Sequence, residues 1–228
     1  MDITEDDFIF VFPTTDGHTS VLNPYFGTNL ADLTECTAPD VQIMPEYLLA
    51  YWWNHIIQQV DDGPGRAAVV LIGTFIRNIG PAVFDYRAAC RYVRRYLSHL
   101  PNGTAPMAYD LAVARFESCI LRIGVAIACV NGATKIYPPL PPAFTKGDGS
   151  VSERVHLFNN RIKHFGSDIA NAADPGAMPT ASIWITNNGL GCHHKGKDVF
   201  VSFVELAALL QDLSGEAEYR AENPLPAS

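Results

Sequence analysis

Apolar residues recur at helical spacing along most of the chain, and the most regular case lies between residues 150 and 172. There the steps between apolar residues are four, three, four, three and four, through Val151, Val155, Phe158, Ile162, Phe165 and Ile169. Such a stripe is typical of an amphipathic helix that buries one face. Ser150 or Ser152 can cap its start, and "DPG" at 174–176 follows its end. We therefore predict a helix here.

Four further helices are indicated by the same kind of spacing. Their expected ranges are 44–62, 82–100, about 107–130 and 204–214, with a buried helix also favoured over 66–79. Gly80-Pro81 is expected to separate the helix at 66–79 from the helix at 82–100. Gly215 is expected to lie just past the helix at 204–214. The proline-rich segment 137–149 is predicted to be an extended connection.

Strand patterns occur near both ends of the sequence. "FIFVF" at 8–12 and "HTSVLN" at 18–23 predict a β-rich N-terminal segment, and "SIWIT" and "DVFVSF" predict a hairpin within 181–203 joined by "NNGLGCHHKGK". The expected fold class is α+β, mostly α: a bundle of four to five helices with a small β-hairpin. The expected organisation is an N-terminal segment 1–42, a helical domain 43–215 and a flexible tail 216–228.

Composition narrows the possible functions. The net charge of −8 argues against a protein that coats nucleic acid through a large basic field. The five cysteines show no CxxC spacing, and the acidic start "MDITEDDFIF" is unlike a leader, so we expect a cytoplasmic protein with reduced thiols and no membrane span. Motifs for nucleotide hydrolysis, hydride transfer and serine hydrolysis are missing, and no cofactor is expected.

The segment "CHHK" at 192–195 raises the question of a metal site. Structural zinc sites usually combine two separated ligand pairs, and no second Cys/His pair stands at a fitting spacing. We therefore expect no metal and interpret this segment as a mobile loop tip. Trp52 and Trp53 are adjacent, so one is expected in the core and the other at the surface.

The predicted helix at 150–172 carries the residues best suited to catalysis. His164 stands one turn from Asn160 and Arg161, whereas His156 and Lys163 are placed on the opposite flank. An imidazole can move the proton of a ribose 2′-hydroxyl, and a guanidinium can hold the phosphate without a metal. His164, Arg161 and Asn160 are therefore candidate catalytic residues. Candidate substrate-binding residues are Lys163, Arg154, Arg91, Arg94 and Arg95.

The late helix with "NNRIKH" in a mostly helical chain resembles the HEPN superfamily of prokaryotic defence and toxin proteins. The signature of that family is an arginine, a neighbouring polar residue and a histidine four to six residues after the arginine. Here only two residues separate Arg161 from His164, and Asn160 precedes the arginine. The resemblance implies a homodimer that cuts RNA without a metal and is controlled by an antitoxin or other protein partner.

Two alternatives remain open for the same residues. The helix face can be an ordinary solvated surface, or the protein can be a non-catalytic dimerisation or adaptor module that recognises a protein partner. The arginines at 87, 91, 94 and 95 form a basic stripe. This stripe is a solvated face unless the helices pack so that it borders His164, in which case it would become a rim for the RNA backbone.

Overall fold

The computed structural model describes residues 33–42, 47–57, 64–100, 105–136, 142–171 and 181–223. In chain order its elements are α2 (Tyr47–Tyr51), the π-helix η3 (Trp52–Ile57), α3 (Pro64–His99), α4 (Pro106–Ile136), α5 (Val151–Ala170), β1 (Trp184–Ile185), β2 (Gly189–His194), β3 (Lys197–Ser202) and α6 (Phe203–Glu222). The mostly helical α+β class is therefore confirmed. The predicted strands at 8–12 and 18–23 lie outside the described residues.

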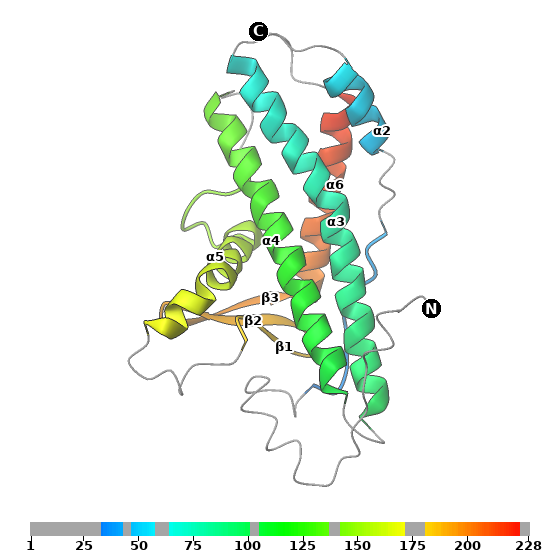
Figure 1. Ribbon diagram of the computed structural model, residues 1–228, viewed down its shortest axis with the longest axis vertical. Coiled ribbons are helices and arrows are strands. Elements are labelled where there is room, and N and C mark those ends of the chain that lie inside the picture. The colour runs from blue at the N-terminus through cyan, green and yellow to red at the C-terminus, as the bar shows by residue number, and fades with distance from the viewer. Residues whose placement is uncertain are drawn as a thin grey trace.

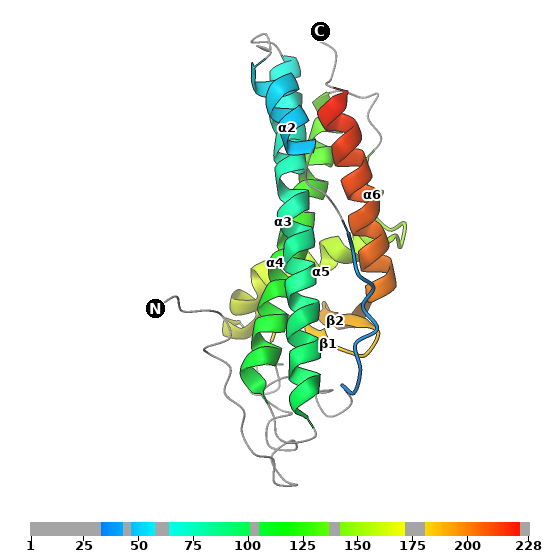
Figure 2. The same ribbon diagram turned by 90° about the vertical axis from the view of Figure 1, so that its right-hand side faces the viewer.

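The long helices α3 and α4 form an antiparallel pair that runs the length of the protein, and α6 packs along it (Figures 1 and 2). The expected break at Gly80-Pro81 is wrong, because α3 continues through Pro81. A proline inside a helix removes one backbone hydrogen bond. Here the buried face runs without interruption from Phe75 and Ile79 to Ala82 and Tyr86, so packing against α4 outweighs that loss.

Two groups of buried side chains make up the core. One surrounds Phe116 of α4, whose ring stacks on Phe203 at 5.5 Å and meets Tyr86 edge-on at 6.1 Å. The other lies beside α2, where small residues of α4 and α6 such as Ala133 and Ala217 pack against α3. Of the described helices, the part of α3 from Arg66 to His99 is long and apolar enough to span a membrane, but it packs as a core helix here.

Asp85 is a carboxylate buried between α3 and α4, where it is only 3% exposed. It accepts hydrogen bonds from Arg115 Nη1 at 3.1 Å, Ser118 Oγ at 2.7 Å and Arg122 Nε at 2.8 Å, all on α4. A buried charge needs such partners, because it has lost its hydration. These contacts fix the register of the two long helices.

Helix α6 is longer than its sequence pattern predicts. Gly215 lies inside it rather than after it, and residues 216–222 are helical rather than part of a flexible tail. Ala217 and Ala221 are fully buried, and Arg220 Nε pairs with Glu216 Oε1 at 2.7 Å. Tertiary burial therefore carries the helix past the glycine.

The β-region is a three-stranded antiparallel sheet in the order β1-β2-β3. The predicted hairpin was wrong about its loop, because "GLGCHH" is the central strand: Cys192 pairs with Val199 and His194 with Lys197. Glycine is required at 191, where a Cβ would lie 2.3 Å from the Trp184 ring. The turn lies at Lys195 and Gly196, which both have positive φ, as a tight two-residue hairpin turn requires.

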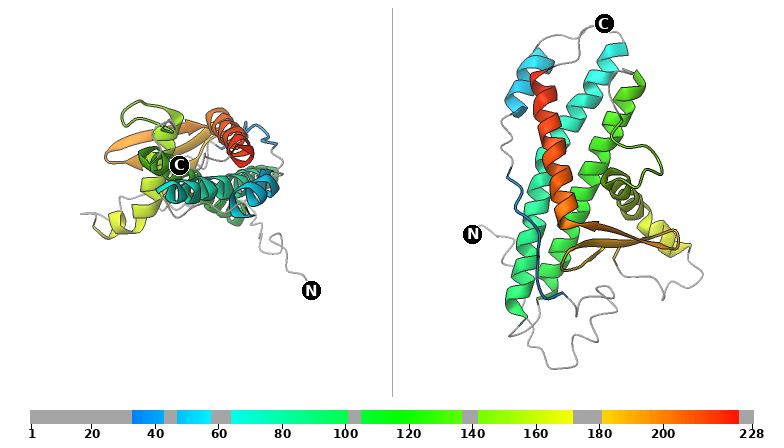
Figure 3. Two further views of the ribbon diagram at one scale, coloured as in Figure 1. Left: turned by 90° about the horizontal axis from the view of Figure 1, so that it is seen from above. Right: turned by 180° about the vertical axis from the view of Figure 1, so that it is seen from behind.

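Helix α5 crosses the sheet and packs against α4, β2, β3 and α6 (Figures 1 and 3). Residues 33–42 form an extended segment that runs along α3 and reaches the loop between β1 and β2 at Asn187, and we call it the strap (Figure 2). Tyr86 Oη donates to the Pro39 carbonyl at 3.0 Å, and Arg94 Nη2 donates to the Ala38 carbonyl at 3.1 Å. The strap thus borders α3, whereas α5 borders α4.

Candidate functional site

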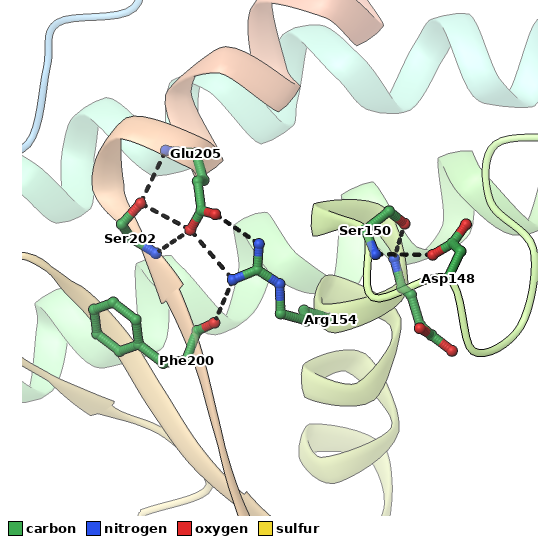
Figure 4. A network of polar contacts seen from close by, with 7 residues as sticks. Asp148, Ser150, Arg154, Phe200, Ser202 and Glu205 are labelled. Carbon is green, nitrogen blue, oxygen red and sulfur yellow. Dashed lines mark hydrogen bonds and ion pairs between the residues drawn. The ribbon is translucent and has the colours of Figure 1, made fainter.

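The start of α5 is fixed by caps. Ser150 Oγ accepts a hydrogen bond from the Glu153 backbone at 3.1 Å, which confirms the predicted N-cap (Figure 4). Asp148 Oδ1 in turn accepts from the Ser150 backbone at 2.8 Å, and Glu153 Oε2 accepts from the Gly149 backbone at 2.8 Å. These bonds satisfy amide groups that a helix start leaves unpaired.

Arg154 fastens α5 to the sheet and to α6 (Figure 4). Its guanidinium donates to Glu205 Oε1 at 2.6 Å and to the Phe200 carbonyl at 2.9 Å. Glu205 also belongs to the capping box that begins α6 at Ser202. The hydrogen bonds from Arg154 and then from the Ser202 backbone lower the pKa of Glu205 to about 2. Because both Nη atoms of Arg154 are held by Glu205 and the Phe200 carbonyl, we do not include it in the proposed RNA site.

Arg161 is buried on the face of α5 that meets the sheet. Its side chain is 5% exposed, and its Nη1 donates to Asp168 Oδ2 at 2.8 Å. The guanidinium carbon lies 4.7 Å from the centre of the Phe165 ring, in a cation–π contact. Within the described part of the chain, its Nε and Nη2 atoms have no hydrogen-bond partner. Two buried nitrogen atoms of a cation, which carry three N–H donors, are therefore left to interact with another group.

Asn160 turns toward His156. Its Nδ2 lies 3.1 Å from His156 Nε2, and the His156 ring packs at 5.4 Å from Phe144. The placement of His156 on the opposite flank from Asn160 was therefore wrong. Residues four apart lie on one helix face, so His156 and Asn160 are neighbours.

His164 is exposed, and so is Lys163. Among the described residues its imidazole has no hydrogen-bond partner, while its backbone carbonyl accepts from Ser167 Oγ at 2.8 Å. Helix geometry places His164 one turn from Asn160, Arg161 and Asp168. The predicted trio thus occupies adjacent positions, although Arg161 points to the sheet, Asn160 to His156 and His164 to solvent.

His194, at the end of β2, joins this group from another element. Burial lowers the pKa of His194, and the positive charges of Lys195, Arg161 and His156 lower it further, while Asp168 raises it. These electrostatic contacts identify the end of β2 as a neighbour of the α5 face. We call His156, Asn160, Arg161, His164, Asp168 and His194 the α5 site.

The α5 site combines groups that can move protons and bind an anion. A neutral imidazole accepts a proton, a protonated one donates a proton, and a guanidinium stabilises negative charge. The described residues contain no group of three histidine, cysteine or acidic side chains arranged to hold a metal ion. Cys192 and His193, which were expected in a loop tip, lie in β2, and His193 Nδ1 is 3.0 Å from Asp198 Oδ1.

The basic stripe on α3 does not border His164. Helix α4 lies between α3 and α5 (Figure 1). Arg87 and Arg94 of the stripe contact the strap instead. Arg87, Arg91 and Arg94 line a pocket there. The prediction that Arg91, Arg94 and Arg95 bind RNA beside His164 is therefore not supported, because they lie on another side of the protein. Lys163 remains as the candidate substrate-binding residue beside His164.

Comparisons with known proteins give no relative for this chain: no family model, no curated protein and no solved structure matches it. The fold and the α5 site therefore define the molecule as a mostly helical α+β protein with a histidine-rich polar site on its penultimate helix.

Proposed function

We propose that the α5 site is a metal-independent ribonuclease centre of a HEPN-like protein from a prokaryotic defence or toxin system. One observation carries the proposal: His156 and His194 come from two elements to the Arg161–Asp168 ion pair, and His164 stands one helical turn from both residues of that pair. Cleavage of RNA by its own 2′-hydroxyl needs one proton acceptor, one proton donor and a cation, and this group supplies all three.

In the proposed reaction, His194 acts as the base. Its lowered pKa keeps the imidazole neutral near pH 7, so it takes the proton of the 2′-hydroxyl. The 2′-oxygen attacks phosphorus, the bond from phosphorus to the 5′-oxygen breaks, and the exposed His164 gives its proton to that leaving oxygen. Arg161 and Lys163 stabilise the charge on the phosphate, and Asn160 orients His156. The products are a 2′,3′-cyclic phosphate and a 5′-hydroxyl.

The remaining parts of the proposal follow from the family resemblance. We expect the protein to act in the cytoplasm as a homodimer and to be held inactive by an antitoxin or another protein partner. The helical bundle and the position of the site on a late helix support this view, because a second copy could bring two such helices together in one groove.

The test is cleavage of labelled RNA in EDTA by the purified protein and by His164→Ala, His194→Ala and Arg161→Lys variants. We expect each variant to lose at least about tenfold in rate, within the range that acid–base groups contribute. His99→Ala, at the end of α3, is the matched control and should keep the rate of the wild type. A strand with deoxyribose at the cleaved position should stay intact. Equal rates in all proteins, or no cleavage by the wild type, would exclude the proposed ribonuclease function.

The alternative function is a dimerisation or adaptor module, and one observation favours it. Leu49, Trp52 and Trp53 are 77%, 55% and 65% exposed, so the expectation that one tryptophan lies in the core is wrong. Large apolar side chains grouped on a surface are typical of protein interfaces. Sedimentation of the wild type and of a Trp52→Ser/Trp53→Ser variant, together with the RNA assay, distinguishes the two functions. If the protein is an adaptor, the double substitution should change its assembly state, and the wild type should cleave no RNA.

A further inference from the structure

Two cysteines far apart in the sequence meet between the strap and α3. Cys36 lies in the strap and is partly buried, whereas Cys90 lies on α3 and is 3% exposed. Tyr86 and Arg94, one helical turn before and after Cys90, hold the Pro39 and Ala38 carbonyls just after Cys36, and this docking brings the two thiols together. A disulfide bond between them would hold the sulfur atoms roughly 2 Å apart and join the strap to α3.

The strap is held so that this contact is maintained. On the C-terminal side of Cys36, hydrogen bonds from α3 hold the carbonyls of Ala38 and Pro39, and Arg87 Nε lies 3.7 Å from Asp40 Oδ1. Next to Cys36, the Thr37 backbone donates to the Asn187 carbonyl at 3.1 Å. On the N-terminal side of Cys36, the Thr34 backbone donates to Asn187 Oδ1 at 2.9 Å, so contacts on both sides position Cys36 against Cys90 before any reaction.

A pocket of about 290 Å³ opens where Cys90 meets the part of the strap that follows Cys36. It is lined by Pro39, Asp40, Tyr86, Arg87, Cys90, Arg91 and Arg94. Three guanidinium groups face one carboxylate, so the pocket carries net positive charge. Positive charge next to a thiol favours the thiolate, which is the nucleophilic form.

The electrostatics of the pair assign different roles to the two thiols. The hydrogen bond from Cys90 lowers the pKa of Cys36 to about 6, with help from the Ala38 backbone and the charge of Arg94. The same hydrogen bond and burial raise the pKa of Cys90. Cys36 is therefore mostly thiolate at neutral pH, and Cys90 holds the proton.

We propose that Cys36 and Cys90 form a peroxide-reactive dithiol that closes to a disulfide between the strap and α3. The Cys36 thiolate attacks a hydroperoxide, the O–O bond breaks, and the leaving oxygen takes a proton to become water or an alcohol. Cys36 is then a sulfenic acid. Cys90 loses its proton and attacks the Cys36 sulfur, and the sulfenic oxygen leaves as water. Two thiols are oxidised by two electrons, and one peroxide is reduced.

The other three cysteines lack these features and serve as internal controls. Burial raises the pKa of Cys119 and Cys129, and it raises the pKa of Cys192 to about 12. Cys129 lies on α4 beside the second core group. None of the three should react with peroxide at the rate of Cys36, because their thiolates are scarce.

The experiment treats the purified full chain with stoichiometric hydrogen peroxide and maps its cysteines by mass spectrometry without reduction. We expect an intramolecular Cys36–Cys90 bond that dithiothreitol reverses. In Cys90→Ser the sulfenic acid of Cys36 should persist and be trapped by dimedone, and Cys36→Ser should form no disulfide. Arg94→Gln should slow the reaction of Cys36, whereas Cys129→Ser should match the wild type.

The readout at each cysteine of the wild type keeps the test independent of how well the variants fold. A different disulfide, or a Cys36 that reacts no faster than Cys129 in the wild type, would overturn the proposal. The result does not depend on RNA cleavage, so the dithiol and the proposed ribonuclease can fail separately.

Discussion

Gly124 of α4 and Asn159 of α5 contact each other so closely that no side chain fits at position 124. A Cβ there would lie 2.5 Å from Asn159 Cγ, and Asn159 itself is 3% exposed. This contact sets how near α5 lies to α4, and therefore where the α5 site stands relative to the sheet. The glycine is required by close approach rather than by backbone conformation.

Gly124→Ala is therefore expected to destabilise the protein by about 1–3 kcal/mol, the usual effect of overpacking a core. Gly215→Ala is the matched control, because it is also inside a helix but a Cβ there meets nothing within 4 Å. That change should stabilise the protein by up to about 1 kcal/mol through helix propensity. Urea unfolding of both variants measures the contrast, and equal effects would contradict the steric explanation.

Pro81→Ala is expected to raise the free energy of unfolding by roughly 1–3 kcal/mol. Alanine restores the backbone N–H that proline lacks in the middle of α3 and removes its clash with the preceding turn. Pro106 is the control, since it occupies the first position of α4, where proline is well tolerated. Thermal unfolding should show a higher midpoint for Pro81→Ala and little change for Pro106→Ala.

The imidazole of His194 should titrate below its ordinary pKa of 6.5. Its proton is bound more weakly in the folded protein than in the unfolded one, so acidification through this range should reduce stability. Lys195→Gln should move the pKa of His194 upward, because it removes a nearby positive charge. Titration by NMR measures both effects. A midpoint that does not move in the variant would contradict the electrostatic cause.

The Arg154–Glu205 ion pair should make stability depend on acid pH. The pKa of Glu205 is lowered from 4.5 to about 2, so the stabilisation is present above pH 4.5 and is lost as the pH falls toward 2. In Arg154→Gln the pKa of Glu205 should rise, and this loss should shift to higher pH. Urea unfolding at a series of acid pH values measures this pH dependence. Arg220→Gln, which removes the ion pair with the exposed Glu216, is the control for a surface pair.

Alkylation of Cys36 by iodoacetamide should follow a titration with a midpoint near pH 6. Because this pKa is lowered on folding, the thiolate stabilises the folded state above the unfolded value of 9.0, and the effect fades as the pH falls toward 6. Arg94→Gln should shift the alkylation midpoint upward, since Arg94 contributes positive charge. Mass spectrometry at each pH gives the midpoint, and one near 9 in the wild type would refute the assignment.

Parts of the fold could be predicted because their local signals agree with the tertiary structure. The stripe from Val151 to Ile169 and the cap at Ser150 correctly predicted α5. Pro81 and Gly215 misled, because burial of their neighbours outweighs local helix-breaking tendencies. The glycines of "GLGCHH" predict a loop, because glycine is common in turns. In the structure Gly191 is needed in a strand, because the Trp184 ring packs directly over it.

The functional groups were harder to predict than the helices. His164, Arg161 and Asn160 are neighbours by helix geometry alone, but the burial of Arg161 against the sheet depends on how α5 packs. His194 and the thiol pair Cys36–Cys90 come together only through tertiary contacts, and no sequence spacing reports such contacts. The i, i+4 spacing of His156 and Asn160, in contrast, is a signal in the sequence that does indicate their contact.

The strap borders α3 whereas α5 borders α4, and this placement of the two sites has an energetic consequence. Sites that share no partner and lie far apart usually contribute independently, so their mutational effects add. A protein that carries both His164→Ala and Cys36→Ser should lose the sum of the two single losses in unfolding free energy, with no coupling term. A substitution at one of these two sites should therefore leave the contribution of the other site to stability unchanged.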